Sequence, residues 1–310
     1  MDGVLLLAAV GCVGNPVNGK NQLDRRRRAT LRKQNPALRR LSPREAGQAR
    51  EVGMRSILAL GIVLVAASTT SAAITSKTVE YSHGGTTLEG FMAWDDAIKG
   101  TRPGVLIVHQ WMGLTAYERM RAEQLAKLGY VAFAVDVYGK GVRPASSAEA
   151  GGLAGKYKGD RTLLRARVAA GLDALRASGL ADAKRIAAIG YCFGGTAALE
   201  LARSGADIAG VVSFHGGLDS PSPADGKNIR AKVLVLHGAD DPYVPAKDIA
   251  AFQQELRDAK VDWQMVYYAG AVHSFTHKEA GSDPSKGAAY DERADRRSWQ
   301  AMLTFFQEVL

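Results

Sequence analysis

Short apolar segments alternate with longer amphipathic segments along most of this chain. The apolar runs are rich in Val, Ile and Ala, which is typical of parallel strands buried on both faces. Alternation of this kind predicts an α/β domain with a doubly wound, mostly parallel sheet flanked by helices. After a hairpin over residues 78–91, strands are expected near 104–108, 130–135, 185–191, 208–214, 232–237 and 262–268.

The intervening segments predict helices that bury one apolar stripe each. In the last of them Trp299, Met302 and Phe305 recur at helical spacing and are expected in the core. The stretch 138–159 is rich in Gly, Ala and Ser, which predicts a flexible rim of a pocket. Helices are expected near 116–127, 161–178, 196–203, 246–259 and 292–308.

A cysteine lies at one strand-to-helix transition, within the run Gly190-Tyr-Cys-Phe-Gly-Gly195. Small residues on both sides of Cys192 allow the tight turn of a nucleophile elbow, which lifts the side chain above the sheet. The N-terminus of the following helix favours a thiolate over a thiol. A buried structural cysteine is the simpler alternative, but the flanking glycines favour a nucleophile.

An acid and a base follow this cysteine in the chain order that α/β-hydrolases use. Asp241 lies in the polar turn after strand 232–237, where Asp240 is its competitor. His273 lies in the loop after strand 262–268. The carboxyl ends of parallel strands meet at one edge of a sheet, so the three side chains are expected to form a catalytic triad.

The other histidines are less suited to be the base. His83 falls in the hairpin, and three more lie at strand ends, where a histidine satisfied by its neighbours is the simpler interpretation. His273 and His277 have a spacing that binds zinc on a helix, but Gly270 and Ser274 indicate a loop, so no metal site is predicted. The three histidines at strand ends are His109, His215 and His237.

Several motifs in this order resemble the dienelactone hydrolase family of the α/β-hydrolase superfamily. The resemblance extends from about Thr78 to the C-terminus, and several ordered motifs are far more specific than any one of them. The motifs are Val105-Leu-Ile-Val-His-Gln-Trp-Met-Gly-Leu114, Leu128-Gly-Tyr-Val-Ala132, Asp136-Val-Tyr-Gly139, Gly190-Tyr-Cys-Phe-Gly-Gly195, Asp241-Pro-Tyr-Val-Pro245 and His273-Ser-Phe275.

The resemblance implies a hydrolase of small esters or lactones that works through an acyl-thioester on Cys192. His273 would be its base and Asp241 the acid that orients this base. The backbone N–H groups of Trp111 and Phe193 would form the oxyanion hole. Neither a metal nor an organic cofactor is needed, and the partner is the small-molecule substrate.

Two positions depart from the family pattern. Gln110 stands where the family has a glutamate that helps to deprotonate the thiol, and an amide cannot accept that proton. His277 stands where the family has a carboxylate-binding arginine, whereas Ser274 matches. Either Cys192 and His273 form an ion pair at rest, or the protein is a weak or inactive hydrolase that serves as a binding protein on the same fold.

Positive charge is concentrated before the domain. Of a net charge of +9, residues 1–53 contribute +7, from eleven Lys or Arg against four Asp or Glu. This segment lacks periodic apolar positions, so a disordered extension is predicted. A translation start assigned too far upstream would explain such an extension. No aromatic residue or motif accompanies the charges, so no nucleic-acid partner is predicted.

Residues 54–73 have the pattern of a signal peptide. Met54-Arg55 precedes the almost wholly apolar run 57–67, and small residues follow at Ser71-Ala72-Ala73. An uncleaved membrane anchor is the alternative. Cleavage predicts an exported protein, periplasmic or secreted, with no stable membrane association. Residues 74–310 are then expected to form one catalytic domain, which is a monomer or a homodimer. Cys192 is then the mature chain's sole cysteine.

Overall fold

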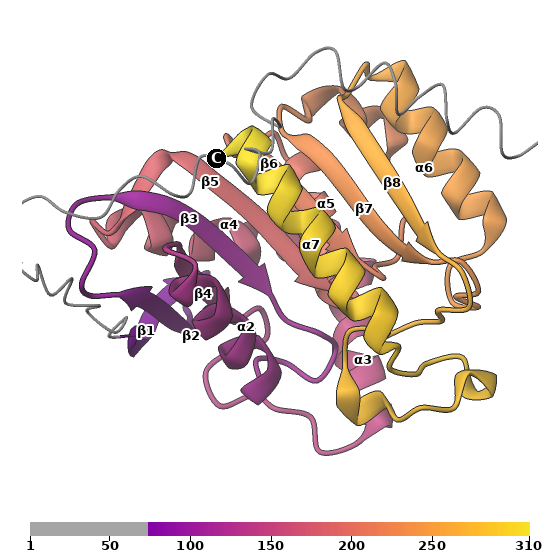
Figure 1. Ribbon diagram of the computed structural model, residues 1–310, viewed down its shortest axis with the longest axis horizontal. Helices are drawn as coiled ribbons and strands as arrows, with labels where there is room; N and C mark the ends of the chain where they lie inside the picture. Colours follow the sequence, from indigo (N-terminus) through magenta and orange to yellow (C-terminus); the bar gives the residue numbers. More distant parts are fainter. Residues whose placement is uncertain (1–73) are drawn as a thin grey trace, which may run out of the picture. The chain divides into compact units, whose positions relative to one another are not determined.

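An eight-stranded sheet organises residues 74–310, the part of the chain that the computed structural model describes (Figure 1). Its strand order is β1-β2-β4-β3-β5-β6-β7-β8; β1 pairs with β2 and β2 with β4 antiparallel, and all later pairs are parallel. The predicted α/β-hydrolase fold is confirmed. The strands are β1 (Ile74–His83), β2 (Thr86–Asp95), β3 (Arg102–Val108), β4 (Val131–Val135), β5 (Ala181–Tyr191), β6 (Gly210–Phe214), β7 (Lys232–Gly238) and β8 (Trp263–Tyr268).

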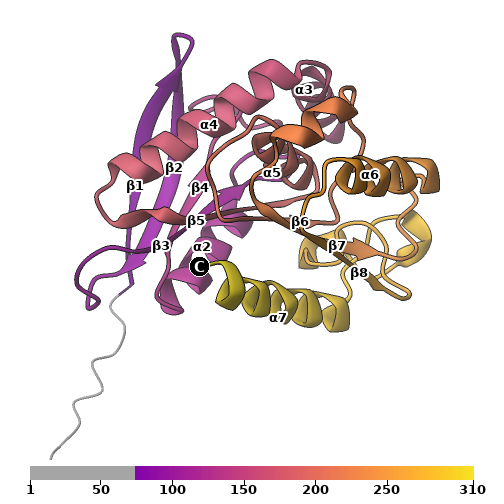
Figure 2. The ribbon, with the colours of Figure 1, turned by 90° about the horizontal axis from the view of Figure 1, so that it is seen from above.

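Helices cover both faces of this sheet (Figure 2). One face packs against α4, α5 and α6 through residues such as Val168 and Phe252, and the other against α2 and α7 through Leu125 and Phe306. Met302 and Phe305 are buried as expected, and Trp299 packs against the same cluster while partly exposed. The helices within residues 74–310 are α2 (Ala116–Lys127), α3 (Ser147–Gly159), α4 (Arg161–Ala177), α5 (Phe193–Arg203), α6 (Ala246–Asp258) and α7 (Glu292–Val309), with 3-10 turns η2 (Pro223–Asn228), η3 (Lys278–Ala280) and η4 (Pro284–Lys286).

Helix α3 lies within the stretch 138–159, for which the sequence predicts a flexible pocket rim and no helix. The side chain of Ser146 accepts a hydrogen bond from the N–H of Glu149 and so caps the helix. Ala150, Ala154 and Tyr157 lie on one side of the helix and are buried. Two of these three buried residues are alanines, so the apolar periodicity of the helix is weak in the sequence.

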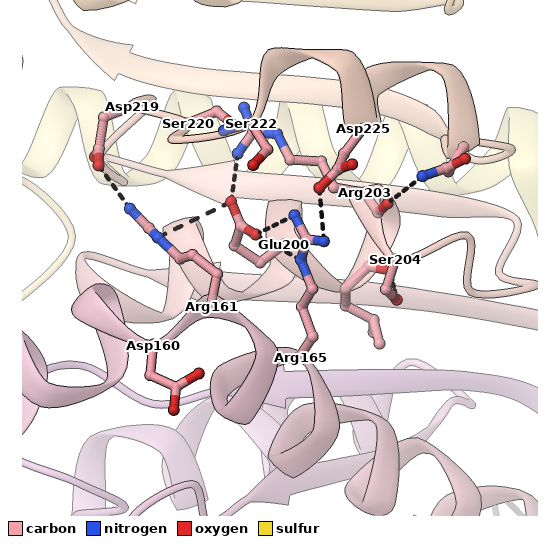
Figure 3. A network of polar contacts seen from close by, with 12 residues as sticks. Asp160, Arg161, Arg165, Glu200, Arg203, Ser204, Asp219, Ser220, Ser222 and Asp225 are labelled. Carbon is pink, nitrogen blue, oxygen red and sulfur yellow. Dashed lines mark hydrogen bonds and ion pairs between the residues drawn. The ribbon is translucent and has the colours of Figure 1, made fainter.

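Buried ion pairs fix helix α5 (Figure 3). This helix begins directly after Cys192. The carboxylate of Glu200 is fully buried and accepts hydrogen bonds from Arg203 at 2.9 Å and Arg165 at 2.8 Å. Arg161 approaches the same carboxylate at 4.0 Å. Arg203 also donates to both carboxylate oxygens of Glu255, at 2.8 and 2.7 Å. The network therefore ties α5 to α4 on one side and to α6 on the other.

Replacing Glu200 by alanine is expected to lower the free energy of unfolding by about 3 kcal/mol, because buried guanidinium groups lose a shared partner. Urea denaturation measures this change. Asp182→Asn is the matched control, since it breaks an exposed pair with Arg185 and should leave the midpoint almost unchanged. Equal midpoints for the Glu200→Ala variant and the control would contradict a stabilising role for the network.

The predicted extension over 1–53 and signal peptide over 54–73 lie outside the described residues and stay predictions. Within residues 74–310, no helix has both the length and the apolar character needed to cross a membrane.

Candidate active site

The turn between β5 and α5 places Cys192 at the carboxyl edge of the sheet. Its backbone adopts φ 55° and ψ −119°, in a region that residues other than glycine rarely occupy. A Cβ on Gly190 would overlap the carbonyl group of Gly194, and a Cβ on Gly194 would overlap that of Val108. The two glycines therefore let strand, turn and helix pack closely enough to hold the strained cysteine.

Three side chains from three loops form one hydrogen-bonded chain. Cys192 Sγ lies 3.0 Å from His273 Nε2, and His273 Nδ1 lies 2.8 Å from Asp241 Oδ2. The other carboxylate oxygen of Asp241 accepts the N–H of Tyr243 at 2.9 Å, while the neighbouring Asp240 is exposed. The structure thus brings together the cysteine, the histidine and the first-choice aspartate of the sequence analysis.

Two cavities meet at these side chains. Both are lined by Trp111, Cys192, Tyr243 and His273; their volumes are about 180 and 300 Å³. Lys158 of α3 lines the smaller cavity and lies 3.4 Å from Asp219, so its charge is partly neutralised. The smaller cavity is completed by Ala154, Phe193, Thr196, Gly217 and Val244, and the larger by Ser274 and Ala288. A still larger cavity of about 840 Å³ lies between α2 and α7, away from the cysteine.

The surroundings of Cys192 favour its thiolate. Burial alone would raise the pKa of the thiol, but the positive charge of His273 and its hydrogen bond outweigh burial and lower this pKa. The backbone N–H groups of Phe193 and Trp111 also face the sulfur and lower the pKa further. Two backbone N–H groups beside a thiolate are donors of the kind that can stabilise the negative oxygen of a tetrahedral intermediate.

His273 is correspondingly stabilised as an imidazolium. Burial lowers its pKa, but the negative charge of Cys192 and the hydrogen bond to Asp241 outweigh burial and raise the pKa to about 10. The two shifts have one cause, the attraction between thiolate and imidazolium. Both shifts favour the charged thiolate–imidazolium pair over the neutral pair.

Comparison with known proteins places this chain in a family. The family model of the dienelactone hydrolase family matches residues 88–310. The chain belongs to the dienelactone hydrolase family. As a member of this family it is a hydrolase of carboxylic esters or lactones.

Solved structures and a curated relative agree with this family. P91, a dienelactone hydrolase-like promiscuous phosphotriesterase from metagenomic libraries, is 42% identical, with a TM-score of 0.72 over 76% of this chain and 98% of that chain. A structure named m3DLH is also 42% identical, with a TM-score of 0.75 over 77% and 99% of the two chains. The Bradyrhizobium protein named "Probable 2-oxo-3-(5-oxofuran-2-ylidene)propanoate lactonase" is 30% identical over 57% of this chain and 75% of its own length.

The two residues that depart from the family pattern, Gln110 and His277, line an adjoining cavity of about 540 Å³. Trp111 lines this cavity and both cavities at the cysteine, and Ser274 lines this cavity and the larger of those two. His277 Nε2 lies 3.5 Å from the exposed Glu279. An anionic substrate group would therefore meet a histidine that already has a carboxylate neighbour.

Two histidines that were expected to be ordinary strand-end residues contact the candidate site through the backbone. His215 is fully buried; its Nδ1 accepts the N–H of Cys192 at 3.1 Å, and its ring lies 5.2 Å from that of His273. His109 is also fully buried and contacts the backbone of the Trp111 loop. Their positions at the ends of central strands were the available signal, but the hydrogen bonds depend on the fold.

The alkylation of Cys192 by iodoacetamide is expected to be near its plateau rate at pH 7. Because the thiol pKa is lowered, we expect the thiolate to persist at neutral pH and to be lost only as the pH falls through that lowered pKa. Asp241→Asn weakens the imidazolium and should shift the rate profile to higher pH. Asp240→Asn is the matched control and should leave it unchanged. A wild-type rate that rises only near the free-thiol pKa of about 8.5 would contradict a resting ion pair.

Proposed function

We propose that this protein is a cysteine-dependent hydrolase of small esters or lactones, with Cys192 as nucleophile, His273 as acid and base, and Asp241 as the orienting carboxylate. The observation that carries the proposal is the 3.0 Å contact between Cys192 Sγ and His273 Nε2, continued at 2.8 Å to Asp241. The paired N–H groups of Trp111 and Phe193 at the sulfur support it.

In the first step the thiolate of Cys192 attacks the carbonyl carbon of the substrate and forms a C–S bond. The carbonyl oxygen takes the negative charge and is stabilised by the N–H groups of Trp111 and Phe193. Collapse of this intermediate breaks the C–O bond to the leaving group. His273 donates its Nε2 proton to the departing oxygen, which leaves an acyl-thioester and a neutral imidazole.

In the second step water hydrolyses the thioester. Acylation removes the sulfur's negative charge, which is a main cause of the raised pKa of His273, so the imidazole can now act as a base. His273 Nε2 takes a proton from water while the hydroxide attacks the acyl carbon. Breaking the C–S bond releases the acid and restores the thiolate beside the imidazolium. Asp241 holds the Nδ1–H tautomer throughout.

Gln110 has no proton-transfer role in this scheme. The ion pair with His273 already supplies the thiolate, so a glutamate at this position is not required for activation.

The signal-peptide pattern of residues 54–73 further leads us to propose that the protein works after export. N-terminal sequencing of the natively produced protein tests this. A chain that begins before residue 54 would contradict it.

Hydrolysis of a panel of aryl esters and lactones by wild type, Cys192→Ala, Cys192→Ser and Gln110→Glu tests the proposal. Cys192→Ala is expected to lower kcat/KM by at least a factor of about 1,000, whereas Gln110→Glu should change it little. One phosphotriester is included because P91 is described as a phosphotriesterase.

Equal rates for wild type and Cys192→Ala would overturn the assignment of Cys192 as nucleophile. Saturable binding of the panel compounds without any turnover by wild type would instead favour the alternative of a binding protein.

A further inference from the structure

The side chain of His109 is held in one tautomer beside the candidate oxyanion hole. It directly follows β3 and is fully buried. Its Nε2 lies 3.2 Å from the backbone N–H of Val137, which can only donate, so Nε2 accepts. The proton of the neutral ring is therefore on Nδ1, which lies 2.6 Å from the backbone oxygen of Gln110 and donates to it.

That oxygen belongs to the same peptide plane as the N–H of Trp111. In a trans peptide the C=O and the N–H point in opposite directions, so holding one fixes the direction of the other. The Gln110 carbonyl also accepts the N–H of Gly113 at 3.1 Å, as part of a backbone turn. His109 is the side chain that anchors this plane, and the N–H at its other end faces Cys192 Sγ.

We propose that His109 is a positioning residue that aims the Trp111 N–H at the reacting centre. This inference rests on the proposed function for its effect on catalysis, although its effect on the thiol does not. His109 does not touch the reacting atoms; it acts through the Gln110–Trp111 peptide.

The charge state of His109 agrees with this role. Burial lowers the pKa of the His109 ring, and the positive charge of Arg143 lowers it as well. The Gln110 carbonyl and the carboxylates of Glu118 and Asp136 raise this pKa, but burial outweighs them. A neutral ring keeps Nε2 free to accept from Val137 and so keeps the proton on Nδ1. The buried carboxylate of Glu118 accepts the N–H of Gln110 at 3.2 Å. The side chain that donates to the Gln110 carbonyl is that of His109.

A purely structural role is the competing explanation, because the ring of His109 packs against those of Tyr138 and Phe193, with centroids 4.6 and 5.9 Å away. Two substitutions separate these roles. His109→Asn places an amide N–H where Nδ1 stands but removes the ring. His109→Phe keeps a ring of similar shape but removes the donor. The orienting role ranks Asn above Phe in activity, and the packing role ranks them in the opposite order.

The experiment compares wild type, His109→Asn, His109→Phe and His109→Gln by two readouts. The first is the pKa of Cys192, measured by the pH dependence of iodoacetamide alkylation, which needs no substrate. The second is kcat and KM for an aryl ester. His109→Gln has its amide at the Nε2 position and lacks a donor at Nδ1, so Asn against Gln decides the question if the Phe variant does not fold.

His109→Phe and His109→Gln are expected to raise the pKa of Cys192 and to lower kcat by about 10- to 100-fold with KM nearly unchanged, because the oxyanion exists only after attack. His109→Asn should keep the thiol pKa near that of wild type and most of kcat. An unshifted thiol pKa in Phe and Gln, or a kcat order with Asn lowest, would overturn the inference. An inactive wild type would overturn the proposed function alone, since the thiol titration still tests His109.

Discussion

The left-handed backbone of Cys192 is the constraint on which the site depends. A cysteine at φ 55° is held only if the surrounding structure compensates its strain, and here the close approach of Gly190 and Gly194 to backbone atoms does so. Helix α5 begins at the next residue, and the buried ion pairs of Glu200 and Arg203 fix it from its far end. The strain at one residue is thus supported by packing along a whole strand-turn-helix unit.

One histidine at the site differs from the others nearby in the direction of its pKa shift. Burial lowers the pKa of His109, His215 and His237, so these rings are neutral. The pKa of His273 is raised because it alone of these four lies between a thiolate and a carboxylate. Neutral histidines can hold backbone groups in place without competing for the proton that the proposed chemistry moves, which gives similar side chains different roles.

Much of this arrangement could be predicted from the sequence because it depends on order and on local chemistry. The glycines around Cys192 specified the elbow, and the chain order selected Asp241 and His273, which the fold brings to one edge of the sheet. Helix α3 was missed because two of its three buried residues are alanines, which give a weak apolar pattern. The contacts of His109 and His215 were also missed, since a tautomer is set by partners that only the tertiary structure supplies.

In the proposed reaction Cys192 carries the acyl group during turnover. Intact-mass and peptide-mapping spectrometry, after rapid acid quench of a reaction with a bulky, slowly deacylating aryl ester, measures this directly. We expect a mass increase of one acyl group on the peptide that contains Cys192, and no such increase in Cys192→Ala. Turnover with an unmodified Cys192, or with the acyl group on another residue, would contradict it.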